Sequence, residues 1–170
     1  MPMNPSIAEH RVFGRPVSDH DDYDDDVVVV REATQYPSMA LIGRFLLAAI
    51  FVMSGISKLT DIPGTVAHMT QAGIPYADTL AVVAGVSELL GAAALVFGLL
   101  ARAGAVGLIL YMIPTTLIFH AFWSVEGKER MPQMLNFMKN LAIIGGLAVV
   151  AGFGAGRLSL DHLVRRSRTR

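Results

Sequence analysis

Hydrophobic residues gather into four long runs, at about residues 39–58, 79–100, 103–122 and 134–153. Each run has about 20 residues, which as a helix crosses the ~30 Å hydrocarbon core of a bilayer. A helix on the surface of a soluble bundle shows a polar face at every turn. The second run, by contrast, contains AVVAGVSELLGAAALVFGLL, with Glu88 as its one charged residue. The pattern therefore predicts an all-α fold, an integral membrane four-helix bundle.

The segment between the first two runs, TDIPGTVAHMTQAGIPYAD, has signals of its own. Asp61 and Pro63 are typical of a helix start, and a glycine and then a proline follow about ten residues later. We expect a short interfacial helix over about residues 63–72, with Val66 and Met69 facing the lipid. The next connection is much shorter, since two residues form the hairpin between the second and third runs.

Charge divides the chain into three parts. Only 16% of the residues are charged, against about a quarter in soluble domains. We expect a disordered acidic tail at 1–37, the transmembrane domain at 38–156 and a basic tail at 157–170. Basic residues near the span ends concentrate on the side of the two termini and the hairpin: Arg31, Arg102, Arg157, Arg165, Arg166, Arg168 and Arg170. By the positive-inside rule, both termini are cytoplasmic.

Ionisable residues inside the spans are costly and usually face the bundle interior or a cavity. Arg44 and Lys58 lie fourteen residues apart, about four turns, and so project from nearly the same helix face. Glu88 lies near the middle of the second run, on a seam of small residues that favours close helix packing. It must be protonated or paired, either in a helix-locking salt bridge to Arg44 or Lys139 or in a functional proton or ligand site. For Arg44 and Lys58 the alternative is extension to the headgroups.

The third and fourth runs add polar residues in the same half of the bilayer. His120 ends the third run, and Asn136, Lys139 and Asn140 form a stripe at positions i, i+3 and i+4 of the fourth. We infer a polar pocket open to the outer side, with Arg44 as a secondary charge partner. Its candidate ligand and proton-relay residues are Lys58, Glu88, His120, Asn136, Lys139 and Asn140.

The chain contains no cysteine. This excludes a disulfide framework, an iron–sulfur site and a thiolate zinc site within the chain. No metal site is predicted, and a redox role would need a cofactor or partner held by other side chains. Haem ligation by His120 with His68 or a methionine is only weakly indicated, because a lone histidine near an interface is often only a hydrogen-bonding anchor.

Six motifs occur in a fixed order over residues 41–161. They are RFLLAAIFVMSGISKL at 44–59, GIP at 73–75, GVSELLG at 85–91, FHAFW at 119–123, NFMKNLAIIGG at 136–146 and RLSLD at 157–161. With these motifs the chain resembles the DoxX family of small four-helix membrane proteins. The resemblance implies a multi-pass protein of the bacterial inner membrane.

The functions implied by the resemblance are diverse. Some members resemble a subunit of a thiosulfate:quinone oxidoreductase, others are associated with oxidative-stress defence, and distant relatives act as assembly chaperones. The first hypothesis is a membrane subunit or accessory of a quinone-linked oxidoreductase or redox-stress complex, in which His120, Lys139 and Asn140 donate to the quinone and Glu88 with Lys58 relays protons. Whether the chain itself is an enzyme stays open.

Two alternatives belong to other classes. One is a membrane scaffold or assembly chaperone whose acidic and basic tails are docking arms. The other is a small-molecule or ion transporter that uses a Glu88–Lys139 pair. The expected partners are the bilayer and either another membrane protein or a second copy of the chain, and nothing in the sequence indicates nucleic-acid binding.

Overall fold

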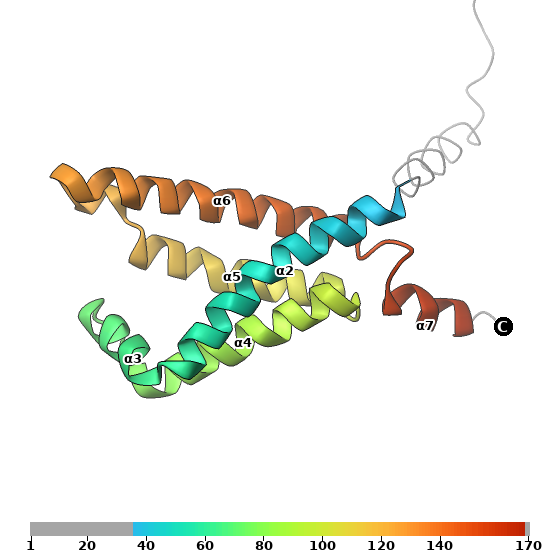
Figure 1. Cartoon of the computed structure of the whole chain (residues 1–170), viewed down its shortest axis with the longest axis horizontal. Helices are drawn as coiled ribbons and strands as arrows, with labels where there is room; N and C mark the ends of the chain where they lie inside the picture. The colour runs from blue at the N-terminus through green and yellow to red at the C-terminus, as the bar shows by residue number, and fades with distance from the viewer. Residues whose placement is uncertain (1–35, 169–170) are drawn as a thin grey trace, which may run out of the picture. The chain divides into compact units, whose positions relative to one another are not determined.

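The computed structural model describes residues 36–168, and these residues form helices without any strand (Figure 1). Four of the helices are long and apolar enough to cross a membrane. The predicted all-α membrane bundle is thus confirmed. The elements are α2 (Pro37–Thr60), α3 (Ile62–Gln71), α4 (Ala77–Phe97), α5 (Ala101–Phe119), η1 (Phe122–Ser124), η2 (Gly127–Glu129), α6 (Arg130–Phe153) and α7 (Leu160–Arg168). The acidic tail predicted at 1–37 falls almost entirely outside the described residues.

The four spans are arranged as two pairs of helices. Helix α2 packs along α4, α5 packs along α6, and the contact between α4 and α5 joins the pairs. Figure 1 shows the pairs close together near α7 and separating toward α3. We refer to these two ends of the bundle as the α7 end and the α3 end.

The α7 half of the bundle holds the tightest core. Ala48, Leu95, Ala101, Ala105 and Leu147 are each at most 1% exposed. Small side chains let membrane helices approach closely, which strengthens packing in the absence of a hydrophobic force between helices. This half of the bundle is therefore closed, whereas the other half has room for a cavity.

The hairpin between α4 and α5 lies two to three residues earlier than expected, at 98–100 instead of Ala101–Arg102. Its backbone is left-handed at Gly98 (φ 62°) and Leu100 (φ 52°). A Cβ on Gly98 would lie 2.3 Å from Arg44 Nη1, so glycine is required there for space as well as for its backbone conformation. The tight turn fixes the register in which α4 and α5 run antiparallel.

Helix α3 forms where expected, but its apolar side was assigned wrongly. Asp61 caps the helix, because its Oδ1 accepts a hydrogen bond from Gly64 N at 3.0 Å. Met69 is only 7% exposed and packs with Ala77 of α4, and Val66 is half-buried against the same cluster. The turn after α3 folds it back onto α4, so these side chains face protein instead of lipid.

The basic segment at 157–170 contains a helix, α7, that the sequence analysis did not predict. The Asp161 carboxylate accepts hydrogen bonds from Leu100 N at 2.9 Å and Ala101 N at 3.2 Å. These are free amides at the start of α5, where a negative charge also complements the helix dipole. Asp161 therefore fastens α7 to the hairpin.

Candidate functional site

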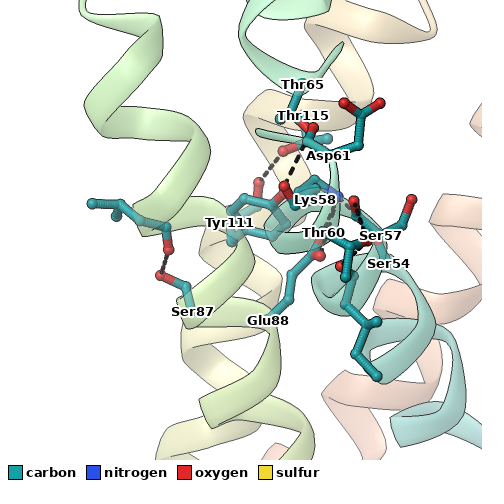
Figure 2. Close-up of polar contacts among 12 residues, drawn as sticks. Ser54, Ser57, Lys58, Thr60, Asp61, Thr65, Ser87, Glu88, Tyr111 and Thr115 are labelled. Atoms are coloured by element: carbon teal, nitrogen blue, oxygen red, sulfur yellow. Dashed lines mark hydrogen bonds and ion pairs between the residues drawn. The ribbon is translucent and has the colours of Figure 1, made fainter. Parts of the chain in front are cut away.

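An ion pair between Lys58 and Glu88 lies at the centre of the candidate site (Figure 2). Lys58 Nζ is 3.1 Å from each carboxylate oxygen of Glu88 and donates to Ser54 Oγ at 2.6 Å. Ser54 lies one turn deeper in α2, so the lysine side chain points into the bundle. The alternative in which Lys58 extends to the headgroups is therefore wrong.

Two glycines bring the charged groups together. A Cβ on Gly55 of α2 would lie 2.9 Å from the carbonyl oxygen of Gly85 on α4. The two backbones thus touch one turn away from Lys58 and Glu88. This close approach lets the Lys58 side chain reach across to the carboxylate.

The pair is shielded unequally from the surroundings. The side chain of Glu88 is 5% exposed, and that of Lys58 is 22% exposed. In a low-dielectric interior, two partners stay charged only when they are well paired and hydrogen-bonded. The charged form of Glu88 is thus stabilised by Lys58. The Lys58 side chain itself is partly exposed to open space.

That open space is a cavity of about 680 Å³ in the α3 half of the bundle. Most of its wall is apolar, and α2, α3, α4, α5 and α6 all contribute to it. The ionisable and amide groups on the wall are Lys58, His68, Glu88, Tyr111, His120 and Asn140. A mostly apolar pocket with a few convergent polar groups is typical of a small-molecule site.

The cavity is partly open to the surface of the bundle. Leu80, Val83 and Ile118 line it and are 39%, 50% and 47% exposed. Apolar side chains therefore line the open part of the wall, which suits a molecule that enters from lipid.

Four of the six candidate residues line this cavity, namely Lys58, Glu88, His120 and Asn140. His120 Nδ1 is 2.9 Å from Gln133 Oε1, which orients the ring and leaves Nε2 for a ligand. Asn140 Nδ2 donates to the buried Thr116 Oγ1 at 3.0 Å, so the amide is fixed against α5. These contacts hold both side chains at the cavity wall.

Asn136 and Lys139 are not among the lining residues. Lys139 is exposed, and Asn136 is half-buried outside the cavity. A stripe at i, i+3 and i+4 covers about 100° of a helix, and Lys139 and Asn140 lie at its opposite edges. The edge with Asn140 meets α5, so Lys139 faces outward.

Arg44 lies fourteen residues before Lys58 on α2, far from Glu88. It has a structural role at the α7 end of the bundle. It is 1% exposed and donates to Leu95 O at 3.0 Å and to Leu158 O at 2.5 Å. These bonds join α2 to the end of α4 and to the segment before α7. The helix-locking salt bridge that the sequence suggested for Glu88 exists, but its partner is Lys58 and not Arg44 or Lys139.

Tyr111 and the role of His68 in this wall were missed by the sequence analysis. Tyr111 interacts with Glu88 and Thr115, and the His68 ring stacks on Phe119 at a centroid distance of 4.7 Å. The hairpin between α4 and α5 could have revealed Tyr111. In such a hairpin, residues at equal distances before and after the centre, here Leu99, lie opposite each other. Glu88 is eleven residues before Leu99, so the residue opposite it is at about position 110. For His68 the sequence offers no comparable signal.

Metal binding receives no support from the described part of the chain. Within residues 36–168, no group of three or more His, Cys, Asp or Glu side chains could hold a metal ion. The polar groups of the cavity are hydrogen-bond donors and a charge pair, which suit an organic ligand better.

Comparisons with known proteins place the chain among membrane proteins of one family. Residues 39–121 match the family model described as DoxX. The chain is 36% identical to the inner membrane protein YphA of Escherichia coli over 126 residues, which cover 74% of the chain and 90% of YphA. It is 32% identical to the inner membrane protein YqjF of the same organism, over 74% of the chain and 92% of YqjF. No solved structure matches the chain.

Proposed function

This chain belongs to the DoxX family and is a multi-pass inner membrane protein, and we propose that it is a quinone-binding membrane subunit or accessory of an oxidoreductase or redox-stress complex. The observation that carries the proposal is the Lys58–Glu88 pair on the wall of an apolar cavity that opens to lipid. A quinone is an apolar molecule of the bilayer with two carbonyl acceptors, and this cavity offers donors within hydrocarbon.

The cavity wall supplies suitable donors. The Lys58 ammonium has three protons, which it shares among Ser54 Oγ and the two carboxylate oxygens of Glu88, and it can turn one of them to a quinone carbonyl. The Asn140 amide is a further donor on the same wall, because Nδ2 has two protons and gives one of them to Thr116 Oγ1. His120 gives its Nδ1 proton to Gln133 Oε1, so Nε2 of the neutral ring is an acceptor, and the Tyr111 hydroxyl interacts with Glu88. In this proposal Lys58 takes the place of Lys139 and Asn140 keeps its role as a donor, because Lys139 is exposed outside the cavity.

The pair also provides a route for protons. Reduction of a quinone by two electrons from a partner dehydrogenase takes up two protons as well. Glu88 is buried, whereas Lys58 lies in the last turn of α2 and is 22% exposed at its side chain. A proton can therefore pass between the α3 end and the cavity through these two groups.

The alternatives have less support. The transporter hypothesis needed a Glu88–Lys139 pair, and Glu88 instead pairs with Lys58. The scaffold hypothesis placed one docking arm in residues 1–36, which lie almost wholly outside the described residues. The cavity itself favours a bound small molecule.

Equilibrium binding of short-tailed ubiquinone and menaquinone analogues to the purified protein in nanodiscs tests the proposal. Wild type should bind one of the two, and Lys58→Met and Glu88→Gln should each weaken binding at least ~10-fold, because a hydrogen bond to a charged group contributes ~1.5–3 kcal/mol. Lys139→Gln is the matched control, since it also removes a charge from a span, and it should bind like wild type. Binding of neither analogue to wild type, or equal loss in Lys139→Gln, would refute the proposal.

A further inference from the structure

A second hollow lies beside the cavity, along the outer side of the α4–α5 contact. It has a volume of about 540 Å³ and is lined by apolar side chains and glycines, apart from the groups it shares with the cavity. It runs along α4 from Ser87 to Phe97, ten residues or about 15 Å at ~1.5 Å per residue. We call it the α4–α5 groove, and its floor and sides include Gly91, Ala94, Phe97, Ala103, Gly104 and Gly107.

The groove and the cavity adjoin each other. Ser87 and Tyr111 line both hollows. The Ser87 hydroxyl donates to the Val83 carbonyl of its own helix at 2.6 Å (Figure 2). Its hydrogen bond is therefore already made, and an apolar ligand can lie against it. Tyr111 interacts with Glu88 on the cavity side. A molecule long enough to pass this shared boundary would reach from the charged pair into the groove.

The two hollows differ in chemistry. The cavity holds the ion pair, two histidines and an amide, whereas the groove has no ionisable group other than Tyr111 among its lining residues. Leu90 and Leu100 on its rim are 67% and 68% exposed to the lipid side. One compartment thus fits a polar head and the other a hydrocarbon chain.

We propose that the α4–α5 groove holds the hydrocarbon tail of the ligand whose head occupies the cavity. This inference rests on the proposed quinone site and specifies a long-tailed ligand. The head lies toward the α3 end, and the tail runs toward the α7 end along the surface of the bundle. Because bilayer lipid is as apolar as the groove, the groove contributes packing and orientation instead of hydrophobic driving force.

The test uses the full-length protein in nanodiscs and two quinone analogues with the same head. One has a short tail, and the other has a long tail with a photoreactive diazirine near its end. After illumination, mass spectrometry locates the label. The label should concentrate in peptides that contain Leu90–Phe97 and Ala103–Gly107, and it should be displaced by excess unlabelled long-tailed quinone.

Gly107→Leu fills the groove without a collision, since a Cβ there meets no atom within 4 Å. The matched control is Gly145→Leu on α6, also an exposed helical glycine with open space, which does not line the groove. Gly107→Leu should cut labelling and lower the affinity ratio of long to short analogue roughly threefold or more. Ala103→Leu provides a second groove variant if Gly107→Leu folds poorly.

The outcomes separate the two proposals. If the short analogue binds but the label spreads evenly over the lipid-facing helices, or Gly107→Leu has no effect, the tail inference is wrong and the quinone site stands. Equal labelling by a diazirine lipid without a quinone head would also overturn it, because an ordinary acyl chain would then fill the groove. If a second copy of the chain covers the groove and blocks its labelling, the tail inference is also wrong. Binding of neither analogue would overturn both proposals.

Discussion

At the scale of single residues, the direction of one lysine side chain decides what the site can do. Lys58 lies near the end of its span and could have extended outward, yet its Nζ bonds Ser54 and Glu88 inside the bundle. Glu88 lies near the middle of α4 and cannot reach water by itself. Loss of the two partners should therefore have unequal consequences.

Lys58→Met should destabilise the protein more than Glu88→Gln does. The first leaves a buried carboxylate without its cation, at a cost of up to ~3–5 kcal/mol, while the second leaves a lysine that can turn outward. The double variant Lys58→Met, Glu88→Met should recover most of the loss, because apolar residues of similar volume fit a low-dielectric site. Reversible unfolding in mixed micelles measures these differences. A double variant as unstable as Lys58→Met alone would contradict the account.

The sequence identified four cavity residues because charge at membrane depth is rare and costly. Lys58, Glu88, His120 and Asn140 could be found in this way. Lys139 was chosen wrongly, because the spacing along a helix does not tell which edge of a stripe meets a neighbour. Tyr111 was missed because a tyrosine in a membrane span is not unusual by itself. Its importance follows only from the register of the α4–α5 hairpin, which places it opposite Glu88.

At the scale of helices, close contact between α2 and α4 sets the geometry of the site. Gly55 lies against the backbone of Gly85 and the side chain of Leu89. The spans and their order were predictable from hydropathy, whereas the apolar side of α3 was not. Apolar side chains pack equally well against lipid and against protein. The hydropathy pattern of a membrane protein therefore cannot tell its lipid-facing surface from its core.

Gly55→Ala should separate α2 from α4 and weaken the Lys58–Glu88 pair. Its Cβ would lie 2.9 Å from both the Gly85 carbonyl oxygen and Leu89 Cγ, and overpacking of this kind costs ~1–3 kcal/mol. Gly43→Ala is the matched control in the same helix, because a Cβ there meets no atom within 4 Å. Thermal unfolding and quinone binding of the two variants should differ. Equal behaviour would show that the close contact is unimportant.

At the scale of the whole molecule, the two helix pairs are closed at the α7 end and separated around the cavity at the α3 end. Arg44 and Asp161 hold the closed end together through backbone groups of α4, the α4–α5 hairpin and the segment before α7. The sequence predicted a pocket in the other half but not this fastening, since Arg44 and Leu158 are 114 residues apart. We expect the α3 end to face the periplasm, because basic residues concentrate at the other end.

Cysteine labelling tests this orientation in a chain that has no natural cysteine. Lys128→Cys, in η2 beside the α3 end, should react with a membrane-impermeant maleimide in cells whose outer membrane alone is permeable. Ser167→Cys, in α7, should react only after the inner membrane is opened. The opposite pattern would place the cavity on the cytoplasmic side.

The most direct test of the central claim is the quinone that accompanies the protein from its own membranes. Wild type and the Lys58→Met, Glu88→Met double variant are purified in mild detergent, and the extracted quinone is quantified by chromatography per mole of protein. The account predicts close to one quinone per wild-type chain and a background amount in the double variant. Equal amounts in both proteins, or only background in wild type, would contradict it.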